Sequence, residues 1–167
     1  MGILVLILAA GWRAYASPET GTGTLTLPQP SPNVGEKARE FTAPTINNKK
    51  FSVKDKGIYV VTFWSTLNQD SYQAKDGFAD LAERYSTSDV AFGAIYVGDA
   101  SGEYDKAPYS VIQDSTGRLT SLYNVKRVPR LFVIEDGKVR FVYNDYNEAN
   151  EELLEDTLDE MLAEDSG

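Results

Sequence analysis

The fold is decided by the stretch Ile58-Tyr59-Val60-Val61-Thr62-Phe63-Trp64 and by the residues that follow it, Ser65-Thr66-Leu67-Asn68-Gln69-Asp70-Ser71. The first seven residues form a nearly continuous apolar, β-branched and aromatic run, which is typical of a central strand covered on both faces. From Ser71 to Tyr85 the apolar side chains lie near helical spacing and predict an amphipathic helix. Its predicted buried residues are Tyr72, Phe78, Leu81, Ala82 and Tyr85. A strand therefore passes into a helix at a short polar corner.

The remaining elements complete an α/β pattern. Strands are predicted at 51–53, 90–97 and 109–113, with a short helix at 118–123. Asp136-Gly137 lies between the β-rich runs Arg130–Glu135 and Lys138–Tyr143, and a two-residue Asp-Gly loop in this setting predicts a hairpin. The run Glu148–Ala163 predicts a helix that buries Leu153, Leu154, Leu158, Met161 and Leu162. This order predicts a mixed central sheet with helices on both faces.

Composition excludes several classes of chemistry. The chain has 167 residues, of which 42% are hydrophobic, and this is enough for one domain with a sizeable core. It contains no cysteine, which excludes disulfide bonds, thiol catalysis and thiolate metal sites within the chain. It contains no histidine, which excludes Ser-His-Asp and Cys-His catalytic sets and histidine-based zinc sites. Asp99, Glu103 and Asp105 in one loop lack EF-hand spacing, and we expect neither a metal site nor a cofactor.

The net charge is −9, from 25 acidic and 16 basic residues. The excess is concentrated between Asp145 and Asp165, where there are ten acidic residues and no Lys or Arg. No basic footprint for nucleic acid is visible in the sequence, and anionic lipid headgroups would be repelled. We interpret the acidic run as the solvated face of the last helix, with a docking face for a basic partner as the alternative.

The N-terminal segment, residues 1–16, is strongly apolar. Its core is Ile3–Ala10, and a helix over the whole segment would be about 24 Å long against roughly 30 Å for a hydrocarbon core. Ala14-Tyr15-Ala16 matches the small-x-small pattern of a signal-peptidase site, although no basic residue precedes the apolar run. We interpret the segment as a membrane anchor. An export signal cleaved after Ala16 and a buried helix of a soluble domain are the alternatives. The anchor residues would be Ile3, Leu4, Leu6, Ile7 and Trp12.

Residues 17–37 form a predicted linker that is rich in proline and glycine. The stretch Pro28-Gln29-Pro30-Ser31-Pro32 favours an extended, polyproline-like path. At full extension such a linker would hold the domain tens of ångströms from its anchor. The globular domain is expected at 38–167 and ends in the acidic helix.

Two motifs carry a family resemblance. Phe63-Trp64-Ser65-Thr66-Leu67-Asn68-Gln69-Asp70-Ser71 aligns with a family corner that has the pattern Phe-Trp-Ala-Thr-Trp-Cys-x-x-Cys. Tyr123-Asn124-Val125-Lys126-Arg127-Val128-Pro129 is followed by a strand, by Asp136-Gly137-Lys138 and by a second strand, in the order that this family shows. From about Arg39 to Ala163, the chain therefore resembles the membrane-anchored thioredoxin-like proteins of the TlpA/ResA type, which are thiol-disulfide oxidoreductases.

The resemblance implies a thioredoxin-like fold without its usual chemistry. Asn68 and Ser71 occupy the two cysteine positions, and Leu67 replaces the preceding Trp. Thiol–disulfide exchange requires a thiolate that attacks sulfur, so we expect a redox-inactive member. No histidine is present to activate Ser71, and Lys75 is interpreted as a solvated helix residue rather than as its base. Asn68 is predicted to cap the helix by accepting the N–H of Asp70 or Ser71.

The resemblance also implies that Val128-Pro129 is a cis peptide that faces the corner. In the redox-active relatives, the backbone beside this proline pairs with an extended substrate peptide, and strand addition of this kind needs no sulfur. No catalytic residue is expected. The candidate peptide-binding residues are Trp64, Leu67, Asn68, Ser71, Val128 and Pro129.

These features predict a non-catalytic binding or scaffold domain, tethered to the extracytoplasmic face of a membrane. Its partners would be proteins, and it would serve as an accessory or assembly subunit of a membrane complex. Two alternatives stay open from the sequence. One is a descendant of a cytochrome-maturation oxidoreductase with a residual or different enzymatic activity, and the other is a holdase that binds unfolded peptides beside Pro129. After cleavage near Ala16 the protein would instead be exported and soluble.

Overall fold

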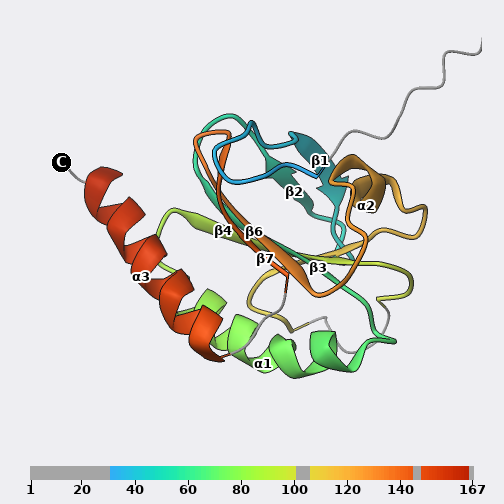
Figure 1. The fold of residues 1–167 in the computed structure, drawn as a ribbon. Coiled ribbons are helices and arrows are strands. Elements are labelled where there is room, and N and C mark those ends of the chain that lie inside the picture. The colour runs from blue at the N-terminus through green and yellow to red at the C-terminus, as the bar shows by residue number, and fades with distance from the viewer. Residues whose placement is uncertain (1–30, 101–105, 145–147, 166–167) are drawn as a thin grey trace, which may run out of the picture.

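The computed structural model describes residues 31–100, 106–144 and 148–165 (Figure 1). Its elements in chain order are β1 (Phe41–Pro44), β2 (Lys50–Val53), β3 (Ile58–Trp64), α1 (Gln69–Arg84), β4 (Val90–Tyr96), β5 (Ser110–Gln113), α2 (Arg118–Leu122), β6 (Arg130–Glu135), β7 (Lys138–Tyr143) and α3 (Glu148–Asp165). The predicted anchor residues and the loop acids Glu103 and Asp105 lie outside the described residues. Within the described ranges, no helix is both long and apolar enough to cross a membrane.

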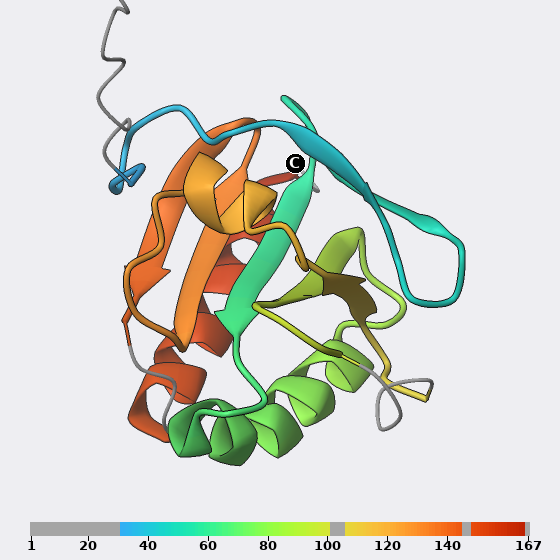
Figure 2. The ribbon, with the colours of Figure 1, turned by 90° about the vertical axis from the view of Figure 1, so that its right-hand side faces the viewer.

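Five strands form a mixed sheet in the order β5-β4-β3-β6-β7. β3 pairs in parallel with β4 and antiparallel with β6, so that Ile58 lies between Val90 and Glu135. α1 and α3 cover one face of the sheet, whereas α2 and the β1–β2 hairpin cover the other (Figure 1 and Figure 2). The predicted architecture, a mixed sheet with helices on both faces, is confirmed.

β3 is buried along its whole length, as its apolar run predicts. Its side chains alternate between two cores, because successive residues of a strand point to opposite faces. Those in the core with α1 and α3 are Ile58, Val60 and Trp64, and those in the core with α2 and the hairpin are Tyr59, Val61 and Phe63. The strand therefore joins the two layers, and its C-terminal end leads into the corner.

Tyr123, which follows α2, lies at the centre of the second core. It is fully buried, and its ring centroid lies 5.0 Å from that of Phe132, 5.4 Å from that of Phe63 and 6.0 Å from that of Phe41. Its hydroxyl donates a hydrogen bond of 2.8 Å to the carbonyl oxygen of Arg39. Burial raises the pKa of this hydroxyl, so it keeps its proton and stays a donor.

Gly93 allows the β1–β2 hairpin to pack closely on β4. A Cβ atom at position 93 would lie 2.6 Å from Cζ and 2.8 Å from Cε1 of Phe51, well inside van der Waals contact. The Phe51 ring is buried and packs against Phe41 of β1, with centroids 6.1 Å apart. The space above Gly93 is therefore filled by an aromatic ring.

Two residues predicted to be buried are exposed. Tyr72 of α1 is 64% exposed and Leu153 of α3 is 46% exposed. Each lies one position from a buried residue, Ser71 and Leu154, and one position is about 100° around a helix. The buried face of α1 therefore begins with a small polar residue, which an apolar pattern does not reveal.

The sequence pattern does not predict β1. This strand pairs antiparallel with β2, from Phe41 opposite Val53 to Pro44 opposite Lys50. It alternates buried and exposed residues, but four positions are too few for the alternation to stand out from the sequence.

Two residues of the predicted linker lie along β7. The N–H of Gly35 donates to the carbonyl oxygen of Val139 at 2.8 Å, and the N–H of Val139 donates to the carbonyl oxygen of Glu36 at 2.9 Å. Ala38 continues this pairing through a hydrogen bond to the carbonyl oxygen of Gly137. The segment 35–38 therefore extends the sheet at its β7 edge.

The predicted Asp136-Gly137 hairpin turn is present, with φ angles of 46° and 73°. Oδ2 of Asp136 pairs with Nζ of Lys56 at 3.0 Å, and Oδ1 accepts the N–H of Gly57 at 3.1 Å. The Lys56 and Gly57 hydrogen bonds lower the pKa of Asp136 in the folded chain.

Asp136→Asn is expected to flatten the loss of stability on acidification. At pH values between the two pKa values, the folded chain keeps the Asp136 carboxylate charged, whereas the unfolded chain binds a proton there. The contribution of this carboxylate to the free energy of unfolding is therefore complete above the unfolded-state pKa, about 4. It is lost as the pH falls through the lower folded-state pKa. Urea unfolding measures the free energy of unfolding of the parent chain and of the variant. The difference between the two should shrink as the pH is lowered from neutral to strongly acidic. Asp80→Asn, which removes an exposed carboxylate on α1, is the control; a gap that stays constant with pH would contradict the assignment.

Candidate functional site

The corner between β3 and α1 is held by local hydrogen bonds. Oδ1 of Asn68 accepts the N–H of Ser71 at 2.8 Å from an extended backbone with φ −108° and ψ 122°, so the predicted N-cap is confirmed. The N–H of Asn68 donates to the carbonyl oxygen of Ser65 at 3.1 Å, and the N–H of Leu67 donates to Oγ of Ser65 at 3.2 Å. Asp70 lies in the first turn, where the helix dipole favours an acidic side chain.

Three of the predicted contact residues lie beneath the surface. Trp64 is 1% exposed and packs edge-on against Phe78 of α1, with ring centroids 5.1 Å apart. Ser71 is 3% exposed, and its Oγ accepts the N–H of Ser65 at 3.4 Å. Pro129 is buried as well. The side chains of Trp64, Ser71 and Pro129 therefore support the corner from below, and a role for these residues in peptide binding stays a prediction.

The other three predicted residues are accessible. Leu67 is 96% exposed at the tip of the corner. Val128-Pro129 is a cis peptide, as the resemblance implies. Val128 is half-buried and lines the same cavity as Asn68, so this loop does face the corner.

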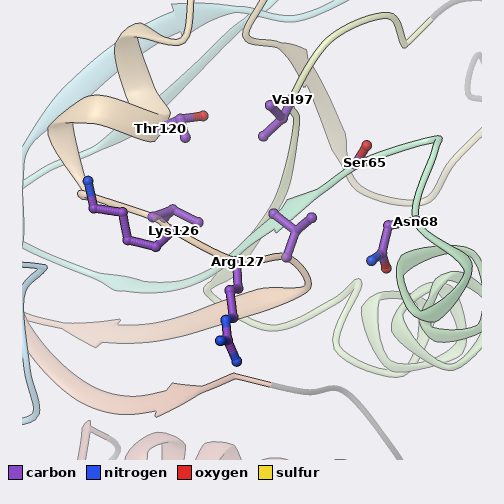
Figure 3. A pocket seen from close by; sticks show the side chains of 8 residues that line it. Ser65, Asn68, Val97, Thr120, Lys126 and Arg127 are labelled. Carbon is purple, nitrogen blue, oxygen red and sulfur yellow. The ribbon is translucent and has the colours of Figure 1, made fainter.

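This corner cavity has a volume of about 450 Å³. It is lined by Ser65, Asn68, Val97, Thr120, Val125, Lys126, Arg127 and Val128. Figure 3 shows Ser65 and Asn68 on one side and Thr120 and Lys126 on the other. The Arg127 side chain extends away from the loop before β6, on the side of the cavity away from Thr120 (Figure 3). The cavity thus separates the start of α1 from the end of α2.

A second cavity of about 490 Å³ adjoins the first, and we call it the arginine cavity. It is lined by Asp70, Lys126, Arg127, Val128, Arg130 and Asn144. Lys126, Arg127 and Val128 line both cavities, so the two lie on either side of the segment 126–128. The two cavities together are called the groove below.

Arg130 is the half-buried cation of the groove. Its Cζ lies 5.3 Å from the centroid of the Phe132 ring, and its Nε is enclosed without a hydrogen-bond partner among the residues that the structure describes. Burial lowers the pKa of the guanidinium, because removal from water disfavours the charged form.

The backbone of residues 126–128 lacks hydrogen-bond partners among the described residues. In the described part of the chain, no backbone hydrogen bond is made by Lys126, Arg127 or Val128. Unpaired backbone groups in a cavity wall are the feature that strand addition requires.

Sequence reasoning did not single out the basic residues of the groove. Lys126 and Arg127 occupy variable positions of the motif, and Arg130 begins a predicted strand. The available signal was three basic residues within five positions of a chain with net charge −9. Among the described residues, no group of three or more acidic side chains could hold a metal ion.

Asn68→Ala is expected to lower the free energy of unfolding by about 1 kcal/mol, because the N–H of Ser71 loses its acceptor. Asn68→Asp keeps an acceptor of equal rank at the same position and is the matched control. Chemical unfolding of the full chain measures both variants. Equal stability of the Ala and Asp variants would show that the cap contributes nothing.

No protein-family model and no curated protein matches this chain. Solved structures do match. A Chlorobium tepidum protein assigned as the thiol:disulfide interchange protein DsbE has a TM-score of 0.69 and 23% identity, over 79% of this chain and 99% of its own. StoA from Bacillus subtilis has a TM-score of 0.59 and 17% identity, over 70% of this chain and 98% of its own. An exposed lipoprotein thioredoxin from Streptococcus pneumoniae has a TM-score of 0.60 and 18% identity, over 72% of this chain and 98% of its own.

The chain therefore has a thioredoxin-like fold. The solved structures that it resembles include thiol-disulfide oxidoreductases of the DsbE type, and this chain has the same fold with no cysteine. The resemblance drawn from the two motifs is confirmed at the level of the fold.

Proposed function

We propose that this chain is a non-catalytic thioredoxin-like domain that binds a protein partner in its groove at the outer face of a membrane. It would act as an accessory or assembly subunit of a membrane complex. The observation that carries the proposal is the backbone of 126–128, which makes no hydrogen bond within the described ranges and forms the wall of a groove beside a corner without thiols.

The chemistry of the corner supports a binding role. Thiol–disulfide exchange requires a thiolate, and the chain has no cysteine. Ser71 is buried, and its Oγ accepts a backbone hydrogen bond. The asparagine at the first cysteine position caps α1. The corner residues are therefore used to hold the backbone in shape, and the groove beside them stays open.

Leu67 supplies an apolar anchor for a partner. Complete burial of a leucine side chain stabilises a complex by about 1.5–3 kcal/mol, and Leu67 is almost fully exposed in the free chain. A strand paired with 126–128 would fill the groove and bring its flanking residues toward the corner.

Export and tethering are supported by two separate observations. The run Ile3–Ala10 is apolar enough to enter a membrane, although its residues lie outside the described structure. One solved structure of similar fold is an exposed lipoprotein. Carbonate extraction of membranes, with sequencing of the mature N-terminus, distinguishes a tethered chain from one cleaved after Ala16.

Site-specific cross-linking tests the binding role. A photoreactive amino acid in place of Leu67 is expected to yield one cross-linked partner of reproducible mass in native membranes. The matched control replaces Val34, which is 62% exposed and precedes the segment paired with Gly137 and Val139, near the hairpin turn. A ladder of many masses from position 67 would favour the holdase alternative. Equal cross-linking from both positions, or none from position 67, would count against docking at the groove.

Leu67→Asp is expected to weaken partner capture by about tenfold or more, because a buried apolar contact is replaced by a charge. Val34→Asp adds the same charge at another exposed apolar residue and should leave capture unchanged. Quantitative recovery of the partner with the purified full-length chain measures both. An unchanged yield for Leu67→Asp would remove Leu67 from the interface.

A further inference from the structure

The groove carries positive charge on a strongly acidic protein. The residues that line the arginine cavity include three basic ones, Lys126, Arg127 and Arg130, and one acidic one, Asp70. The chain as a whole has a net charge of −9. A concave surface of opposite sign to its surroundings concentrates ligands of the complementary charge.

Arg130 gives this charge a defined position. Its Cζ lies over the ring of Phe132, a fully buried residue, at 5.3 Å from the ring centroid, and this cation–π contact favours one position of the charged group. Among the residues that the structure describes, no carboxylate pairs with Arg130, and its enclosed Nε lacks a hydrogen-bond acceptor. A half-buried cation without a partner is costly, and a carboxylate supplied by a ligand would compensate it.

We propose that the groove selects an acidic, extended segment of a partner protein, with Arg130 and Arg127 pairing with its carboxylates. This inference rests on the proposed function, because it specifies the chemistry of the segment that docks along 126–128. Arg127 is exposed and lines both cavities, so it can meet a carboxylate on either side of Val128.

A protein segment fits the groove better than a nucleic acid does. Nucleic acids are bound by broad basic surfaces that neutralise many phosphates, whereas this groove has three cations and also contains Asp70. The backbone of 126–128 has no hydrogen-bond partner in the part of the chain that the structure describes, and a peptide backbone can pair with such a segment.

Peptide titration tests the charge preference. The probes are a fluorescein-labelled seven-residue peptide that alternates glutamate with valine, its counterpart with glutamine in place of glutamate, and a ten-nucleotide thymidine strand. Fluorescence anisotropy is measured with the full-length chain in neutral detergent. The acidic peptide is expected to bind roughly tenfold more tightly than the glutamine peptide, and added salt should reduce this difference.

The variants assign the preference to the arginines. Arg127→Gln with Arg130→Gln should weaken binding of the acidic peptide far more than binding of the glutamine peptide, so that the two peptides bind alike. Arg127→Gln alone, at an exposed position, should show part of this loss without a change in folding. Lys54→Gln removes one exposed positive charge just before β3, at the end of the strand away from the corner, and should have no effect.

The outcomes separate the two proposals. Equal binding of both peptides, weakened for both by Leu67→Asp, would overturn the acidic preference and leave the docking groove intact. A preference that survives the arginine substitutions would also overturn the inference. Tightest binding of the thymidine strand would replace the protein ligand with a nucleic acid. Binding of none of the three probes would overturn the acidic preference, and cross-linking from position 67 would then decide the docking groove separately.

Discussion

The double variant Asn68→Cys with Ser71→Cys is expected to catalyse the reduction of insulin by dithiothreitol, whereas the parent chain should add nothing to the rate of dithiothreitol alone. The expectation follows from the geometry of the corner. Position 68 caps α1, and its side chain faces the N–H of Ser71 at 2.8 Å. A thiol at a helix N-terminus has its pKa lowered from about 8.5, since the helix stabilises the thiolate.

The second thiol completes the exchange reaction. A thiolate at position 68 would attack an insulin disulfide to form a mixed disulfide, and the thiol at position 71 would then displace the reduced insulin thiol. The single variants Asn68→Cys and Ser71→Cys are the controls, because neither can form the intramolecular disulfide. Turnover is followed by insulin precipitation, and closure of the disulfide by mass spectrometry. A double variant that closes no disulfide would show that the corner has lost more than its sulfur atoms.

Tyr123→Ala is expected to lower the free energy of unfolding by about 3–5 kcal/mol, the usual range for removal of a large aromatic side chain from a core. Its ring lies between aromatic residues of three strands, Phe41, Phe63 and Phe132. The loss would leave a cavity where β1, β3 and β6 meet, a few residues before Val128-Pro129.

Tyr123→Phe separates packing from hydrogen bonding at the same position. It keeps the ring and removes only the 2.8 Å hydrogen bond to the carbonyl oxygen of Arg39, so a loss of about 1 kcal/mol is expected. Chemical unfolding of the full chain measures both variants. Equal losses for Tyr123→Ala and Tyr123→Phe would mean that the ring contributes little and that the contact with Arg39 dominates.

The central elements could be predicted because single residues and local patterns determine them. The apolar run Ile58–Trp64 predicts a strand that is buried on both faces. Asp136-Gly137 predicts the hairpin turn, because both residues tolerate the positive φ angles that the turn needs. The cap at Asn68 also follows from residue type and position alone. In each case, the physical cause lies within a few residues of its effect.

The groove could not be predicted because it depends on tertiary contacts. The contact of Arg130 with the Phe132 ring and the burial of Trp64 under α1 both arise only in the folded chain. Position in a motif therefore marked Trp64 and Ser71 as candidate contact residues, although both are buried. A local pattern contains no information about which side of a corner is covered.

The contact between Gly93 and Phe51 limits how this domain can change in evolution. Since the aromatic ring lies within 2.6 Å of the place of a Cβ atom, even alanine at position 93 requires the Phe51 ring to shift. A lineage that exchanges Gly93 for a larger residue is expected to acquire a smaller residue at position 51 as well. The two positions, on β4 and β2, should therefore covary among descendants of this sequence, which would make them a marker of the hairpin in distant relatives.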